Sequence, residues 1–149
     1  MPTFLLKTEP SDFSFEDLQE KGLCTWDGVA NAGALIAIRS MKKGDSALIY
    51  HTGDERAIVG LAVVTRDAYA DPTHPGTTST GQPKFAVVDL APIAAAKTPF
   101  TLAAVKAEPR FKDFALVTQA RLSAMLVPAP LDAVLRKLAG LPAAHAPNL

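Results

Sequence analysis

The feature that most constrains this chain is a series of short runs of apolar and β-branched residues, each closed by glycine, proline or charged residues. Such runs are typical of β-strands in a compact sheet. We expect strands at residues 3–7, 46–52, 57–64, 85–90 and 122–127, with a short extended segment at 23–26. Because the helices predicted between them do not alternate regularly with the strands, a doubly wound parallel sheet is disfavoured. The pattern predicts a mixed α/β (α+β) domain whose five or six strands form a curled, barrel-like sheet flanked by short helices.

Local signals at the turns place the helices and loops. Ser14 and Asp17 have the spacing of a capping box, which predicts a helix that ends at Gly22. Asn31 is expected to cap a second helix. This second helix is expected at 32–41, and two more helices are expected at 101–106 and 130–138. A hairpin turn is predicted at 53–56 and a long exposed loop at 71–83.

Length, charge and cysteine content narrow the class of protein. A chain of 149 residues has the size of one domain. We expect this domain to cover residues 1–141 and residues 142–149 to form a frayed tail. Its 15 basic and 15 acidic residues balance, so it lacks the broad basic field that drives non-specific duplex binding, and any nucleic-acid contact must be local. The single Cys24 excludes an internal disulfide and a cysteine-based zinc cluster.

No apolar run approaches the roughly 20 residues that cross a bilayer, so we expect a cytoplasmic protein with no membrane partner.

Catalytic and cofactor motifs are absent from the sequence. There is no glycine-rich phosphate loop and no recognisable nucleophile motif, so no cofactor, metal or catalytic residue is predicted. Among the histidines only His51, at the end of an expected strand, is well placed. It can be a structural histidine at the sheet edge, a ligand-contacting group, or a general base with Glu9 or Asp27 as its partner.

The segment around Trp26 differs from ordinary scaffold sequence. The only tryptophan is followed by Asp27 and Gly28, a turn signal, and then by the helix-capping Asn31. This arrangement places a large aromatic face between a strand and a helix N-terminus. Such a face can stack on a nucleobase, which is worth roughly 1 to 3 kcal/mol. Equally, Trp26 can simply fill the core, and the residues alone leave both interpretations open.

Several separated strings in the sequence resemble the EVE domain. They are L-L-K-T-E-P-S-D-F-S at 5–14, W-D-G-V at 26–29, M-K-K-G-D at 41–45, Y-H-T-G at 50–53, I-V-G-L-A at 58–62, A-Y-A-D-P at 68–72 and A-L-V-T-Q-A-R-L-S at 115–123. Together they cover the chain from about residue 3 to 127 in the expected order.

The resemblance implies a PUA-like fold, a small β-barrel flanked by helices and related to the YTH domains. EVE domains are regarded as non-catalytic readers of modified bases in DNA or RNA. By that analogy Trp26 forms one wall of a base pocket. The other residues that the resemblance suggests for its lining are Lys7, Ser11, Val29, Asn31, His51, Thr52 and Ser123.

The chain also departs from the family pattern. Ala30 and Thr118 stand where arginine is common, and residues 32–36 are apolar. Fewer cations at a pocket rim mean fewer phosphate contacts, and each such contact contributes affinity that is independent of sequence. We therefore predict weak binding to long nucleic acid, and a free modified base or another small planar ligand becomes a plausible partner.

Three functions follow as hypotheses. The favoured one is a binding module that holds one modified nucleobase of DNA or RNA against Trp26. The second is an enzyme acting on a nucleobase or small metabolite, with His51 as general base. The third is a protein-interaction module that uses the apolar helix from Leu35 to Met41, which would require that helix to be exposed.

Overall fold

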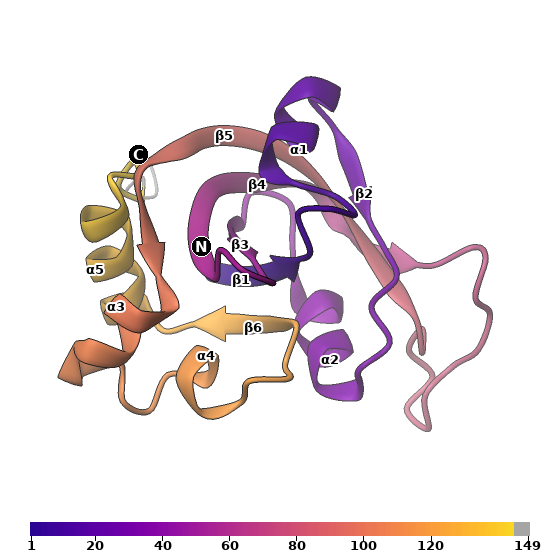
Figure 1. Cartoon of the computed structure of the whole chain (residues 1–149). Helices are drawn as coiled ribbons and strands as arrows, with labels where there is room; N and C mark the ends of the chain where they lie inside the picture. Colours follow the sequence, from indigo (N-terminus) through magenta and orange to yellow (C-terminus); the bar gives the residue numbers. More distant parts are fainter. Residues whose placement is uncertain (145–149) are drawn as a thin grey trace.

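One six-stranded sheet organises the protein, in a computed structural model that describes residues 1–144 (Figure 1). The strands follow the order β2-β5-β4-β3-β1-β6. They are β1 (Thr3–Thr8), β2 (Cys24–Trp26), β3 (Ser46–His51), β4 (Ala57–Ala70), β5 (Ala86–Thr101) and β6 (Ala124–Val127). The helices are α1 (Phe15–Lys21), α2 (Ala32–Ser40), α3 (Leu102–Ala107), α4 (Ala115–Thr118) and α5 (Ala129–Ala139), with a 3-10 turn, η1 (Pro109–Phe111).

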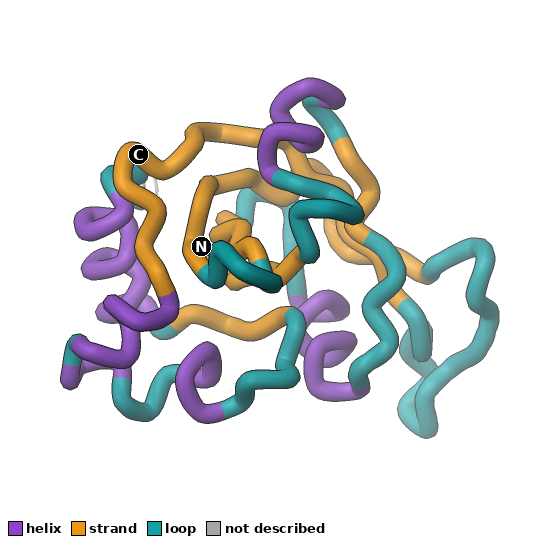
Figure 2. Tube along the Cα trace, in the orientation of Figure 1, coloured by secondary structure: helices purple, strands orange, loops and turns teal. Residues whose placement is uncertain are grey.

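The sheet is strongly curled. Figure 2 shows the strands wound through the middle of the molecule with the helices around the outside. Within the described residues the edge strands β2 and β6 do not pair with each other, so the hydrogen-bonded sheet curls without closing into a barrel. The predicted mixed α/β class with six strands and flanking helices is confirmed.

A parallel pair, β1 and β3, determines where the loops emerge. Lys7 lies opposite Tyr50 and Thr8 opposite His51, whereas all other strand pairs are antiparallel. Because parallel strands end at the same edge of a sheet, the turn that follows β1 and the hairpin that follows β3 emerge side by side.

Apolar clusters cover both faces of the sheet, which explains the nearly continuous hydrophobicity of the strands. Along β1, Phe4 and Leu6 belong to a cluster with residues of α1 and α2, whereas Leu5 belongs to a second cluster with residues of α3, α4 and α5. Successive strand residues point to opposite faces, so the alternation is expected. Trp26 belongs to the first cluster.

Local signals located most elements correctly. Ser14 and Asp17 form the predicted capping box, with the Ser14 Oγ accepting from the Asp17 N–H at 3.1 Å. Asn31 caps α2 by accepting a hydrogen bond from the Ala34 N–H at 3.0 Å. The predicted hairpin joins β3 to β4, and residues 71–85 form a loop that is mostly exposed.

Three strand predictions were wrong in extent. β4 continues to Ala70 instead of stopping at 64, and β5 spans 16 residues instead of six. The second half of β5 contains Pro92, Pro99 and several alanines, which are poor strand formers, so its sequence gives little strand signal. Register shifts along the β4–β5 ladder accommodate these residues. The last strand begins at Ala124 instead of 122, because Leu122 is held in a turn by a hydrogen bond from its N–H to the Gln119 carbonyl.

A buried polar network anchors α5 to β1. Arg136 is 3% exposed, and its Nε donates to Asp132 Oδ1 at 2.8 Å while its Nη2 donates to Thr3 Oγ1 at 2.9 Å. The Thr3 hydroxyl in turn donates to Asp132 Oδ2 at 2.8 Å. Arg136 Nη1 also donates to the Pro142 carbonyl, so the start of the segment predicted as a frayed tail is tied to α5. Residues 145–149 of that segment lie outside the described residues.

None of the helices within residues 1–144 has the length and apolar character needed to span a membrane.

Gly60 determines how closely α1 approaches β4. A Cβ at this position would lie 2.5 Å from the Cε1 and Cζ atoms of the Phe15 ring. We expect Gly60→Ala to lower the free energy of unfolding by about 1–3 kcal/mol, because the ring must shift within a packed core. Urea denaturation measures this loss. The double variant with Phe15→Leu should lose less than the sum of the two single variants, and strict additivity would contradict the proposed clash.

Candidate functional site

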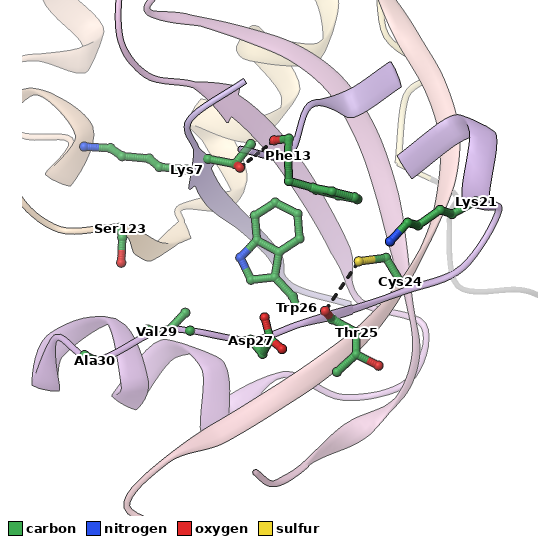
Figure 3. Close-up of a pocket in the computed structure, with 12 residues that line it drawn as sticks. Lys7, Phe13, Lys21, Cys24, Thr25, Trp26, Asp27, Val29, Ala30 and Ser123 are labelled. Atoms are coloured by element: carbon green, nitrogen blue, oxygen red, sulfur yellow. Dashed lines mark hydrogen bonds between the residues drawn. The ribbon is translucent and has the colours of Figure 1, made fainter. Parts of the chain in front are cut away.

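A pocket of about 410 Å³ opens beside Trp26 (Figure 3). It lies between the end of β1, the turn before α1, strand β2 with the segment that follows it, and the segment before β6. Its walls are formed by Lys7, Thr8, Phe13, Lys21, Cys24, Thr25, Trp26, Asp27, Gly28, Val29, Ala30 and Ser123. The volume falls in the range of about 300 to 1,000 Å³ that is usual for small-molecule sites.

Trp26 serves both the core and the pocket. The side chain ends β2, where Trp26 pairs with Val88, and only 8% of the residue is exposed. The Phe13 ring meets the indole edge-on, with centroids 6.0 Å apart and an interplanar angle of 81°. The remaining exposed part of the indole lines the pocket. The two interpretations left open by the sequence are therefore compatible.

The indole N–H is directed toward the pocket. No described residue accepts a hydrogen bond from it. Every described side-chain nitrogen or oxygen that is closed to solvent has a partner, so the indole nitrogen must be accessible to solvent. Figure 3 shows the nitrogen on the side of the ring that faces Ser123 and Val29. Trp26 can therefore offer a ligand one hydrogen-bond donor as well as apolar surface.

Lys7, Val29 and Ser123 lie in the same pocket as Trp26. The Lys7 backbone N–H donates to the Ser123 carbonyl at 2.9 Å, which joins the end of β1 to the segment before β6. The Lys7 ammonium donates to the Ala120 carbonyl at 3.0 Å, and burial lowers its pKa below the ordinary lysine value. In Figure 3 this ammonium extends away from the indole.

Ser11, Asn31 and Thr52 lie outside this pocket. Ser11 is exposed and its hydroxyl donates to Glu9 Oε1 at 3.0 Å. The Thr52 hydroxyl lies 3.1 Å from Glu9 Oε2, and these hydrogen bonds hold the pKa of Glu9 below its ordinary value. Asn31 uses its side-chain oxygen to cap α2.

His51 is buried and fully engaged. Its Nε2 accepts a hydrogen bond from the Phe15 N–H at 3.0 Å, so the other ring nitrogen, Nδ1, carries the proton and donates to Glu55 Oε1 at 2.7 Å. The carboxylate partner is thus Glu55 and not Glu9 or Asp27. Both ring nitrogens hold the start of α1 and the hairpin in place, which leaves neither for a substrate and argues against a general base.

Phe13, Lys21, Cys24, Thr25 and Asp27 line the pocket but were not predicted to do so. Asp27 and Thr25 flank Trp26 directly, so adjacency in the sequence was the available signal. Phe13 and Lys21 reach the pocket only because α1 packs onto the sheet, which no local pattern reveals. Asp27 adds an exposed carboxylate that can accept hydrogen bonds from amino groups.

Comparison with known proteins places the chain in a family. A family model described as the EVE domain matches residues 3–136. The chain belongs to the EVE domain family. Among curated relatives of this EVE protein, human thymocyte nuclear protein 1 is 31% identical across 80% of the chain and 66% of its own length. The mouse protein of the same name is 34% identical across 58% of the chain and 47% of its own length. The chain thus spans about half to two thirds of the length of these relatives.

Solved structures share the EVE fold across nearly the whole chain. A protein of Rhodopseudomonas palustris, solved by NMR, is 39% identical with a TM-score of 0.84, and the match covers 99% of this chain and 100% of that one. The human THYN1 protein, crystallised in complex with 5-methylcytosine-containing DNA, is 30% identical with a TM-score of 0.78 over 92% of this chain and 97% of that one. The PUA-like architecture expected from the sequence is therefore confirmed.

Proposed function

We propose that this EVE domain is a non-catalytic binding module that holds one modified nucleobase of DNA or RNA against Trp26. The observation that carries the proposal is the complex of the human THYN1 protein, a member of the same family, with 5-methylcytosine-containing DNA. The pocket of about 410 Å³ beside the only tryptophan supplies a fitting place in this chain. A modified cytosine in DNA is the partner that we test first.

The chemistry of the pocket walls fits a planar base with polar edges. The indole stacks on the base or borders it, and its N–H donates to a ring nitrogen or carbonyl. The Asp27 carboxylate and the Ser123 hydroxyl accept from an exocyclic amino group, while Val29 and Ala30 provide apolar surface for a methyl group. A base reaches such a pocket by leaving its stack, which costs a few kcal/mol. The balanced net charge is compatible with this role because recognition is local.

The alternatives have less support. The enzyme hypothesis depended on His51, whose two ring nitrogens are occupied by Phe15 and Glu55. The interaction-module hypothesis required an exposed apolar helix, but Leu35, Ile38 and Met41 are buried in the core. We retain the cytoplasmic location predicted from the sequence as part of the proposal.

A binding screen with modified and unmodified bases tests this function. The single tryptophan gives a fluorescence signal at the pocket itself. We expect an oligodeoxynucleotide with one 5-methylcytosine, or one member of a panel of other modified bases, to bind about tenfold more tightly than its unmodified counterpart, since one added methyl group in a fitted pocket gives discrimination of that order. Equal affinity for every modified and unmodified oligonucleotide and nucleoside in the panel would show that the pocket does not read modifications.

A further inference from the structure

A second hollow, of about 310 Å³, adjoins the Trp26 pocket. Lys7 lines both cavities, and the segment before β6 contributes Ser123 to the pocket and Ala120 to the hollow. The Lys7 ammonium extends away from the indole and bonds to Ala120, so this side chain forms part of the wall between them. A ligand in the Trp26 pocket therefore has a second concave site directly beyond Lys7.

The walls of this hollow combine three cationic side chains with the apolar residues Leu102, Leu116, Val117 and Ala120. Lys7, Arg56 and Lys106 all line it, and within residues 1–144 none of them forms an ion pair with a carboxylate. Arg56 comes from the β3–β4 hairpin and Lys106 from α3. The Leu102 N–H donates to the Arg56 carbonyl at 2.8 Å, which holds these two elements together.

Tyr50 adds a hydrogen-bond donor. No described residue bonds to its hydroxyl. Every described side-chain nitrogen or oxygen that is closed to solvent has a partner, so the Tyr50 hydroxyl is accessible to solvent, and Tyr50 lines the hollow. Burial raises the pKa of the Tyr50 phenol, so it stays protonated at neutral pH and keeps its O–H. A neutral donor among three cations suits an oxyanion.

Carboxylates lie near the hollow, but none of them lines it. Glu9 accepts from the Ser11 and Thr52 hydroxyls, and Glu55 accepts from His51. Asp54 and Glu55 line a neighbouring hollow, which shares Arg56 and Lys106 with this one, but they do not line the hollow itself. The walls of the hollow therefore carry three positive charges and no carboxylate, while Glu9 reaches one wall through its hydrogen bond with Thr52.

The backbone at Arg56 also supports a role for its side chain. Arg56 has φ 45° and is the only residue other than glycine in residues 1–144 with a positive φ. Glycine or asparagine adopts this conformation more readily than arginine does. A costly arginine at an exposed hairpin suggests that the guanidinium itself is useful.

We propose that this hollow binds a backbone phosphate of the nucleotide adjacent to the base held in the Trp26 pocket. Arg56 and Lys106 supply the charge, and Lys7 and Tyr50 supply donors on the side nearest the base. The inference rests on the proposed function and adds a defined phosphate contact to it. This contact would take the place of those that arginines at the positions of Ala30 and Thr118 could make.

The test compares charge-neutral variants with a matched control. We expect Arg56→Gln with Lys106→Gln to weaken binding of a single-stranded oligodeoxynucleotide containing 5-methylcytosine by about tenfold at low salt, since charge-assisted hydrogen bonds to one phosphate are lost. The slope of log affinity against log salt should become shallower by about 0.7, the value for one phosphate on a single strand. The control, Lys43→Gln with Lys112→Gln, removes two exposed lysine charges outside the hollow and should leave both quantities nearly unchanged.

The nucleoside separates this inference from the proposed function. 5-Methyl-2′-deoxycytidine has no phosphate, so its affinity should be the same for the wild type and the Arg56/Lys106 variant. If the nucleoside binds but the Arg56/Lys106 variant keeps the wild-type oligonucleotide affinity and salt slope, the phosphate site is wrong and the base pocket stands. If the wild type binds no oligonucleotide more tightly than the nucleoside, the phosphate site is likewise excluded.

Arg56→Gly distinguishes a loss of phosphate binding from a loss of folding. Glycine fits φ 45° without strain, so this variant should melt no lower than the wild type while losing oligonucleotide affinity. Unchanged affinity in a variant that is folded to the same degree would overturn the role of Arg56.

Discussion

Trp26→Ala is expected to weaken nucleobase binding by about 5- to 150-fold and to lower the free energy of unfolding by about 3–5 kcal/mol. The stability loss follows from burial, since Trp26 is 8% exposed and packs in the cluster beneath α1 and α2. The binding loss follows from the missing aromatic surface, which contributes roughly 1 to 3 kcal/mol per stacked base. Denaturation curves and a titration with the best ligand from the panel measure the two effects separately.

Two further variants separate folding from recognition. Trp26→Phe keeps an aromatic ring in the core but lacks the indole N–H and part of the aromatic face, so it should fold with a smaller stability loss and still bind more weakly than the wild type. Phe111→Ala provides the opposite control, because Phe111 is fully buried in the cluster beneath α3, α4 and α5 and does not line the pocket. Phe111→Ala should lose comparable stability but bind normally where it remains folded. Full affinity in folded Trp26→Ala would rule out Trp26 as a contact.

Asp132→Ala is expected to destabilise the fold by about 3–5 kcal/mol without changing ligand affinity. The substitution leaves the Arg136 guanidinium buried without its carboxylate, and an uncompensated buried charge is costly. The Thr3 hydroxyl loses its acceptor at the same time. Urea denaturation measures the loss, and the ligand titration tests independence from the pocket, which none of these residues lines.

A paired replacement shows whether the missing partner or the missing contact matters. Asp132→Leu combined with Arg136→Met removes both charges and leaves apolar side chains, so this double variant should be markedly more stable than Asp132→Ala. If Asp132→Ala costs less than about 1 kcal/mol, the network does not anchor α5 in solution.

The fold was predictable from sequence where its signals are local. The Asn31 cap and the β3–β4 hairpin depend on residues that are adjacent or nearly adjacent in the chain, and both were located correctly. The second half of β5 was missed because Pro92 and its alanine neighbours form a strand only through the ladder that β4 offers them. Long-range pairing overrides weak intrinsic preference in such segments.

The candidate site shows the same division. The W-D-G-V string and the resemblance to the EVE domain drew attention to Trp26 and Val29, which do lie in one pocket with Lys7 and Ser123. Phe13 could not be predicted because it reaches Trp26 only through the packing of α1. The contacts of His51 with Phe15 and Glu55 also depend on the assembled fold, and sequence alone cannot distinguish such a histidine from one that meets a ligand.

The walls of the Trp26 pocket differ in how freely they can change during evolution. Trp26 is part of the core, so few substitutions there are tolerated whatever the ligand. Asp27 and Ala30 are exposed, and surface substitutions usually alter stability by less than about 0.5 kcal/mol. If the pocket binds the proposed base, substitutions at Asp27 and Ala30 can change its ligand preference while Trp26 and the fold are kept. We expect libraries randomised at Asp27 and Ala30 to yield altered selectivity in proteins that still fold.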